Sequence, residues 1–210
     1  MDISNNRNNY NNYNNIVSYK TVKKECSVEF TEKKSVFICS IKSVADEQSA
    51  LDFISKIKSD YNDASHNVYA YIIRNTNAVR FSDDGEPSST AGKPILGQIN
   101  SNELTDILVV VIRYFGGIEL GTSGLTVAYR TAAAEAIAAA GIEERTVDEE
   151  IKITFEYPYL NGVMRIVKEM RPEIVSQTFE MTCEMTLRIR KSESGTLKNR
   201  LSKVESVSFN

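Results

Sequence analysis

The chain has 210 residues, of which 41% are hydrophobic and 25% charged, a composition typical of a globular protein with one large or two small domains. The formal net charge of −3 argues against a general nucleic-acid-binding protein, because such proteins usually carry a basic face. The three cysteines lie far apart, and no segment resembles a signal peptide or a membrane span. We therefore expect a cytoplasmic protein with reduced thiols.

The N-terminal half begins with an asparagine-rich tract over residues 1–15, which predicts a disordered extension. An amphipathic helix is predicted over residues 46–61, with Asp46 placed to cap it. β-Branched and aromatic residues predict strands before and after this helix, with polar breaks in the first of them: residues 19–30, 35–42, 68–74 and 79–81. Residues 91–98 also have helical character.

The most apolar strand is predicted over residues 105–112, and it delivers Arg113 to a glycine-rich loop. An alanine-rich helix should follow over residues 125–140, with Thr122 or Ser123 as its N-cap. The polar residues 143–150 are interpreted as a linker. From residue 151 onward, the periodicity predicts the order β-α-β-β-α-β of a ferredoxin-like domain.

Two glycine-dense segments stand out, residues 82–94 and 113–124, and together they hold six of the chain's ten glycines. Glycine-rich backbone between hydrophobic elements often brings the main chain close to a ligand or partner. The second segment precedes a helix N-terminus, so Arg113 and free amides there predict an anion site. The alternative is a tight structural crossover, since the spacing fits neither a P-loop nor a dinucleotide fingerprint.

The first segment contains three carboxylates, which are either ligands for a hard cation or, more often, caps for local amides in a turn. The single histidine, His66, is the only candidate base for a nucleophilic triad, and no G-x-S-x-G elbow is present. Tyr69 and Tyr71 alternate on one predicted strand and are placed either to stack on bases or to line a half-buried sheet. The residues give no metal site, cofactor motif or set of catalytic residues.

Three sequence runs carry a resemblance to a known family. They read D-A-S-H-N-V-Y-A-Y from Asp63, D-D-G-E-P-S-x-T-A-G-K-P-I-L from Asp83, and V-V-V-x-R-Y-F-G-G-I-x-L-G-T-x-G-L-x-x-A-Y ending at Tyr129. They resemble the Impact family, which includes small bacterial proteins and a eukaryotic translational-control protein. The match covers roughly residues 30–141.

The resemblance implies an α+β protein with an N-terminal domain like ribosomal protein S5 domain 2, followed by a ferredoxin-like βαββαβ domain. We expect the Impact-type domain over residues 16–143 and the ferredoxin-like domain over residues 147–210. This pair is similar to the last two domains of elongation factor G, which suggests a link to translation by analogy. The eukaryotic member acts by binding a regulatory partner and so restrains a kinase of translation initiation.

Some positions depart from the family pattern. Ser89 and Ser123 replace glycines, Glu119 replaces a frequent lysine, and Val127 stands where a basic residue is common. Losing glycines and positive charge weakens the prediction of tight phosphate contact at this loop.

We expect a translation-associated regulatory binding protein that contacts the ribosome, RNA or a protein partner, rather than an enzyme. The alternative is a small cytosolic hydrolase whose site is formed by the two glycine-rich segments. The expected ligand- or partner-binding residues are His66, Asp83, Asp84, Glu86, Thr90, Arg113, Tyr114, Gly116, Gly117 and Gly121.

Overall fold

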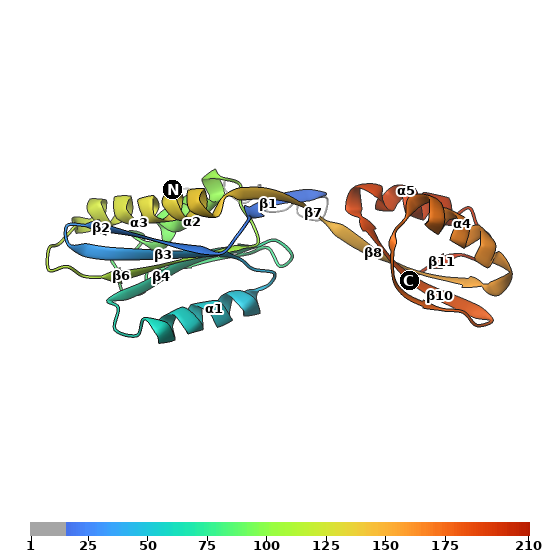
Figure 1. Cartoon of the computed structure of the whole chain (residues 1–210), viewed down its shortest axis with the longest axis horizontal. Helices are drawn as coiled ribbons and strands as arrows, with labels where there is room; N and C mark the ends of the chain where they lie inside the picture. The colour runs from blue at the N-terminus through green and yellow to red at the C-terminus, as the bar shows by residue number, and fades with distance from the viewer. Residues whose placement is uncertain (1–15) are drawn as a thin grey trace, which may run out of the picture. The chain divides into compact units, whose positions relative to one another are not determined.

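A computed structural model describes residues 16–210, so the extension predicted for residues 1–15 lies outside the described part. The described residues divide into two compact units (Figure 1). The first unit comprises Tyr19–Arg145, and the second comprises Ile16–Ser18 together with Thr146–Asn210. No helix within residues 16–210 is long and apolar enough to cross a membrane.

The first unit is built on a five-stranded sheet in which all hydrogen-bonded neighbours are antiparallel. Its strands lie in the order β2 (Cys26–Glu32), β3 (Ser35–Ser43), β6 (Ile107–Tyr114), β4 (His66–Ile73) and β5 (Ala78–Ser82). Helix α1 (Glu47–Asp60) covers one face, and α2 (Gly92–Ser101) and α3 (Gly121–Ala140) cover the other (Figure 1). The sheet is therefore the middle of three layers.

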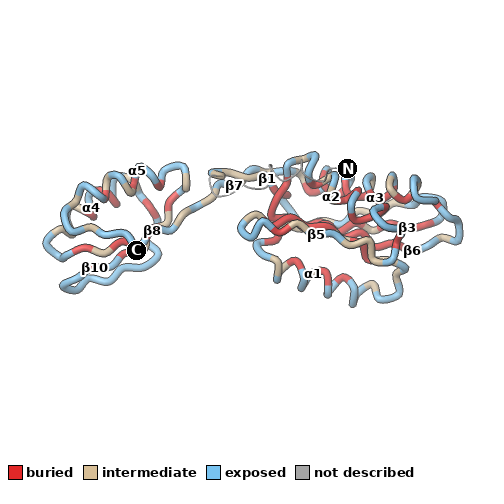
Figure 2. Tube along the Cα trace, turned by 180° about the vertical axis from the view of Figure 1, so that it is seen from behind, coloured by how far each residue is buried: buried red, intermediate tan, exposed pale blue. Residues whose placement is uncertain are grey.

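The predicted apolar strand is the central strand β6, and it is buried on both faces as its composition indicated (Figure 2). Val109 and Val111 pack in the core beneath α2 and α3, whereas Val110 and Ile112 pack in the core beneath α1. This alternation follows from the two-residue period of a strand. The same alternation places Arg113, like Val109 and Val111, on the face of the sheet that α2 and α3 cover.

The two long helices of this unit begin in different ways. Helix α1 starts as predicted, because the Asp46 carboxylate accepts a hydrogen bond from the Ser49 amide at 2.7 Å and completes a capping box. Helix α3 starts earlier than predicted, with Leu120 as its cap and no capping bond from a side chain. The proposed caps Thr122 and Ser123 are wrong, since both residues lie inside the helix.

Two further predictions need correction. Residues 19–30 do not form one broken strand, because β1 (Ser18–Val22) and β2 belong to different sheets. The predicted linker at 143–150 is instead β7 (Ile142–Thr146), which pairs with β1, followed by the start of β8 (Asp148–Glu156). Residues 143–150 alternate between half-buried and exposed positions and are polar except for Val147, so this stretch lacks the apolar signal on which strand prediction depends.

The second unit confirms the predicted β-α-β-β-α-β order. After β8 come α4 (Leu160–Met170), β9 (Glu173–Thr178), β10 (Thr182–Arg190), α5 (Lys191–Leu201) and β11 (Ser208–Phe209). The strands lie in the order β11-β8-β10-β9, with antiparallel neighbours throughout. Both helices pack on one face around Phe155, Met185 and Leu197. The expected α+β fold class, ending in a ferredoxin-like unit, is confirmed.

Candidate functional site

Strand register brings the first two site residues together. Arg113 lies near the end of β6, directly opposite His66 on β4 and Phe37 on β3. Residues paired across antiparallel strands point to the same face, so these three side chains form one row. The guanidinium group of Arg113 lies 5.6 Å from the ring centroids of both Phe37 and Phe115. The aromatic rings therefore hold a buried cation in a fixed position.

The charge of Arg113 is matched by Glu86, which is also buried. Arg113 donates a hydrogen bond from Nη1 to Glu86 Oε1 at 2.6 Å, and the side chains are 6% and 3% exposed. Tyr129 of α3 donates its hydroxyl to the same oxygen at 2.7 Å. Burial, together with the Glu86 carboxylate, raises the pKa of Tyr129 well above its ordinary value, so the hydroxyl keeps its proton. These contacts join two segments that are distant in the sequence.

The ring of His66 is oriented by the backbone before Glu86. Its Nδ1 lies 2.8 Å from the carbonyl oxygen of Asp84. A carbonyl only accepts hydrogen bonds, so Nδ1 carries a proton, and Nε2 is an acceptor when the ring is neutral. Nε2 faces Glu86 Oε1 at 3.8 Å. Gly85, at φ +89°, allows the chain to turn above the ring.

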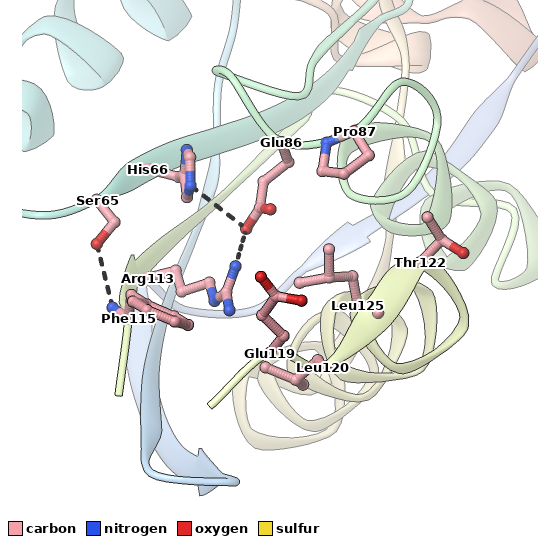
Figure 3. Close-up of a pocket in the computed structure, with 11 residues that line it drawn as sticks. Ser65, His66, Glu86, Pro87, Arg113, Phe115, Glu119, Leu120, Thr122 and Leu125 are labelled. Carbon is pink, nitrogen blue, oxygen red and sulfur yellow. Dashed lines mark hydrogen bonds and ion pairs between the residues drawn. The ribbon is translucent and has the colours of Figure 1, made fainter. Parts of the chain in front are cut away.

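His66, Glu86, Arg113 and Phe115 line a pocket of about 590 Å³ (Figure 3). Its wall combines residues of both glycine-dense segments with the end of the loop before β4: Ser65, His66, Glu86, Pro87, Arg113, Phe115, Glu119, Leu120, Gly121, Thr122 and Leu125. The N-terminus of α3 is part of this wall, through Gly121 and Thr122. Both polar and apolar groups are therefore available to a ligand.

Residues 83–91, here called the acidic loop, use their aspartates to hold the loop itself. Asp83 Oδ1 accepts hydrogen bonds from the amides of Ala91 and Gly92 at 3.1 and 2.8 Å, and Oδ2 accepts one from Ser89 at 2.8 Å. Asp83 thereby caps the start of α2. Its side chain does not line the pocket.

The Asp84 side chain likewise forms hydrogen bonds within the fold. Its carboxylate accepts hydrogen bonds from Lys58 Nζ at 2.8 Å and from the Asn67 amide at 2.7 Å. Burial alone would raise the pKa of Asp84, but these two hydrogen bonds outweigh burial and hold the pKa below its usual range. Only its backbone carbonyl reaches the site, through His66.

The remaining expected residues also lie outside the pocket wall. Thr90 donates its hydroxyl to the carbonyl of Pro87 at 2.6 Å, and Tyr114 donates to Asp63 at 2.8 Å. Gly116 lies against the backbone of Lys34, where an added Cβ would come within 2.0 Å of it. Of the ten expected residues, the structure places four on the wall: His66, Glu86, Arg113 and Gly121.

Other candidate residues from the sequence have structural contacts in the fold. Tyr71 is buried beside α1 and donates its hydroxyl to Glu47, while Tyr69 stacks against it, so the pair does not form an open base-stacking platform. Within residues 16–210, no group of three or more His, Cys, Asp or Glu residues is arranged to hold a metal ion.

Sequence reasoning missed the apolar part of the pocket and its aromatic support. Phe115 follows the buried strand directly and is half exposed, and an aromatic residue beside two glycines was a usable signal. Tyr129 gave no such signal, because a tyrosine in an alanine-rich helix is typical of core packing. We call residues 115–120 the glycine loop.

Comparisons with known proteins agree with the three sequence runs. The model of the Impact N-terminal domain matches residues 33–137. The IMPACT family member YvyE of Bacillus subtilis is 40% identical over 72% of this chain and 70% of its own length. An IMPACT family member of Haemophilus influenzae is 33% identical over 83% of this chain and 86% of its own length.

A solved structure extends this likeness to the fold. The crystal structure of a protein described as hypothetical is 26% identical, covers 92% of this chain and 97% of its own, and has a TM-score of 0.72. Both units therefore occur together in a related protein. The family model and the relatives lead to one conclusion: this chain belongs to the Impact family.

Proposed function

We propose that this chain is a translation-associated regulatory binding protein of the cytoplasm that docks on the ribosome, on RNA or on a protein partner through the glycine loop and its pocket. In this proposal, residues 16–143 form the Impact-type domain that carries the docking surface. Residues 147–210 form a ferredoxin-like second domain. Family membership supports the link to translation, through the translational-control role of the eukaryotic member.

One observation carries the choice of surface. Phe115, which lines the pocket above the buried ion pair, and Ile118 of the same loop are 50% and 43% exposed. Large apolar side chains exposed beside polar groups are typical of surfaces that bind another molecule. The loop is held at its base, because the Phe115 amide donates to Ser65 and the Gly116 amide donates to Ser35. A loop fixed in this way presents its side chains with little loss of entropy on binding.

The hydrolase alternative rests on His66, whose oriented ring presents Nε2 to the pocket. The neighbour of Nε2 in the described part of the chain is the Glu86 carboxylate, which is not a nucleophile paired with a base. The Ser65 hydroxyl accepts a hydrogen bond from the Phe115 amide and so holds the loop. These contacts favour binding over catalysis.

Co-sedimentation with ribosomes at low and moderate salt tests the proposal. The full chain should pellet with ribosomes, and Phe115→Ser should reduce the pelleted fraction because it removes an exposed anchor. Leu51→Ser is the matched control, since Leu51 is an exposed apolar residue of α1 away from the pocket. Absence of wild-type pelleting at both salt concentrations would rule out the ribosome as the partner, and equal loss in both variants would rule out the glycine loop as the docking surface.

A further inference from the structure

The pocket contains an acceptor that the fold does not use. Each described contact of the Glu86 carboxylate goes to Oε1, which faces Arg113, Tyr129 and His66. Within residues 16–210, Oε2 receives no hydrogen bond. The polar atoms that lack both a partner and access to solvent do not include Oε2, so this oxygen is accessible to solvent. Buried carboxylates normally accept at both oxygens. Oε2 therefore opens to the pocket from a side chain that is only 3% exposed (Figure 3).

Glu119 adds a second free acceptor on the same wall. It is exposed, lines the pocket, and makes no hydrogen bond or ion pair with the described residues. The charges of Glu86 and Arg113 offset one another, so Glu119 leaves the wall with a net negative charge when His66 is neutral. When its ring is neutral, His66 offers Nε2 as a third acceptor. The pocket thus offers acceptors at several points.

The other walls suit an apolar stem that carries a cation. Phe115, Pro87 and Leu120 contribute aromatic and aliphatic surface next to these acceptors. A guanidinium or ammonium group binds favourably over an aromatic ring, and its methylene stem packs on apolar side chains. The positive end of α3 opposes a cation, but Glu119 lies just before that end and offsets it. A phosphate would instead meet two carboxylates.

We propose that this pocket binds the guanidinium or ammonium group of an arginine or lysine side chain presented by a protein partner. This rests on the proposed function and names the chemistry of the partner. The oxygens of Glu86 and Glu119 accept hydrogen bonds from the cation, and the ring of Phe115 covers its stem. Charge complementarity of this kind selects a basic protein segment over nucleic acid.

The test is an NMR titration of the isotopically labelled full chain with three probes. They are Nα-acetyl-arginine methylamide, its apolar counterpart Nα-acetyl-norleucine methylamide, and inorganic phosphate. The arginine probe should give saturable shifts at His66 and at residues 113–122, whereas norleucine and phosphate should give none. Equal or stronger binding of phosphate would identify an anion site, and equal binding of norleucine would identify a merely apolar one. Either result overturns the inference.

Two variants sharpen the test without disturbing the buried pair. Glu119→Gln should weaken binding of the arginine probe by about two- to fivefold, because it removes the charge of an exposed carboxylate but keeps an acceptor oxygen. Glu135→Gln makes the same charge change on an exposed part of α3 outside the pocket, and it should leave binding unchanged. Unaltered binding in Glu119→Gln would contradict the inference.

Ribosome pelleting separates this inference from the proposed function. If the chain pellets with ribosomes but the arginine probe gives no saturable shift, the cation pocket is wrong and the proposed function stands. If the probe binds but the chain does not pellet, the pocket stands and the link to the ribosome fails. Pelleting by wild type that is reduced in Glu119→Gln supports both.

Discussion

The acidic loop and the glycine loop look alike in the sequence but do opposite things in the structure. In the acidic loop, Asp83 is committed to backbone amides, Asp84 to Lys58 and the Asn67 amide, and Glu86 to the buried cation. In the glycine loop, the Ile118 side chain is exposed, and the exposed Glu119 carboxylate makes no hydrogen bond or ion pair with residues 16–210. The acidic loop holds the fold together and, among its carboxylate oxygens, leaves only Glu86 Oε2 open to the pocket, whereas the glycine loop presents side chains that the fold does not need.

The comparison shows that charge density alone is a poor signal of a binding surface. Carboxylates gathered beside a helix start are often caps, as Asp83 demonstrates. The informative feature is an exposed side chain that makes no polar contact with the described residues or that leaves apolar surface open, such as Glu119 or Ile118. Substitutions in the acidic loop should therefore change stability, and those in the outer glycine loop should change binding.

The largest expected effect concerns Gly116, the base of the glycine loop. In Gly116→Ala, the new Cβ would lie 2.0 Å from the backbone of Lys34, and neither strand end can move away without breaking pairs. We expect a loss of about 3 kcal/mol or more in the free energy of unfolding, measured by urea denaturation. Gly117→Ala is the control, because it meets only the strain of φ +81° and should lose about 1–2 kcal/mol. Equal losses would contradict the close approach.

The next effect concerns Asp83, which accepts three backbone hydrogen bonds. Asp83→Ala leaves these amides without their partner and should lower the free energy of unfolding by about 2–3 kcal/mol. Asp52→Ala removes an exposed carboxylate that accepts only from Gln48, and it should cost less than about 0.5 kcal/mol. A binding role for Asp83 would be indicated if its variant kept full stability but lost ribosome association.

A smaller, pH-dependent effect is expected at Asp84. Its pKa is lower in the folded chain than in the unfolded chain, so its contribution is present above the unfolded value of about 4 and is lost as pH falls through the folded value. Asp84→Asn should therefore lose about 1 kcal/mol at pH 7 and progressively less below about pH 4. Thermal unfolding across this range measures the difference. A loss that does not depend on pH would show that charge plays no part.

The smallest expected effect is a gain. Ser89 adopts φ +64°, a left-handed conformation that glycine occupies without strain. Ser89→Gly should raise the free energy of unfolding by about 0.5–1 kcal/mol while keeping the amide that bonds to Asp83. Ser88→Gly, at a neighbouring position without positive φ, should be neutral or slightly destabilising. If Ser88→Gly stabilised the chain more than Ser89→Gly, the left-handed conformation of Ser89 would not be a source of strain.

Much of the fold could be predicted because local periodicity agrees with the tertiary structure. The spacing of Ala50, Ile54 and Ile57 predicted α1, and the apolar run of β6 predicted a central strand. The second unit followed from alternating strands and helices of ordinary length. The strand β7 escaped prediction, because Glu143 and Arg145 give it no apolar face.

The site was harder to predict, because it depends on contacts between distant residues. The sequence indicates that Arg113 ends a buried strand, but not that Glu86 folds back onto it. That meeting requires the turn formed by Asp84 and Gly85, both at positive φ, and the hydroxyl of Tyr129 from α3. Such placements depend on how the layers pack, which no local pattern encodes.

Hydrogen exchange of the full chain with and without ribosomes tests the central claim most directly. Amides of the acidic loop should exchange slowly in both states, because Asp83 and the turn hold them. Amides of residues 117–120 should exchange quickly in the free chain and become protected when ribosomes bind. Protection confined to the acidic loop or to residues 147–210, with residues 117–120 unchanged, would contradict the account.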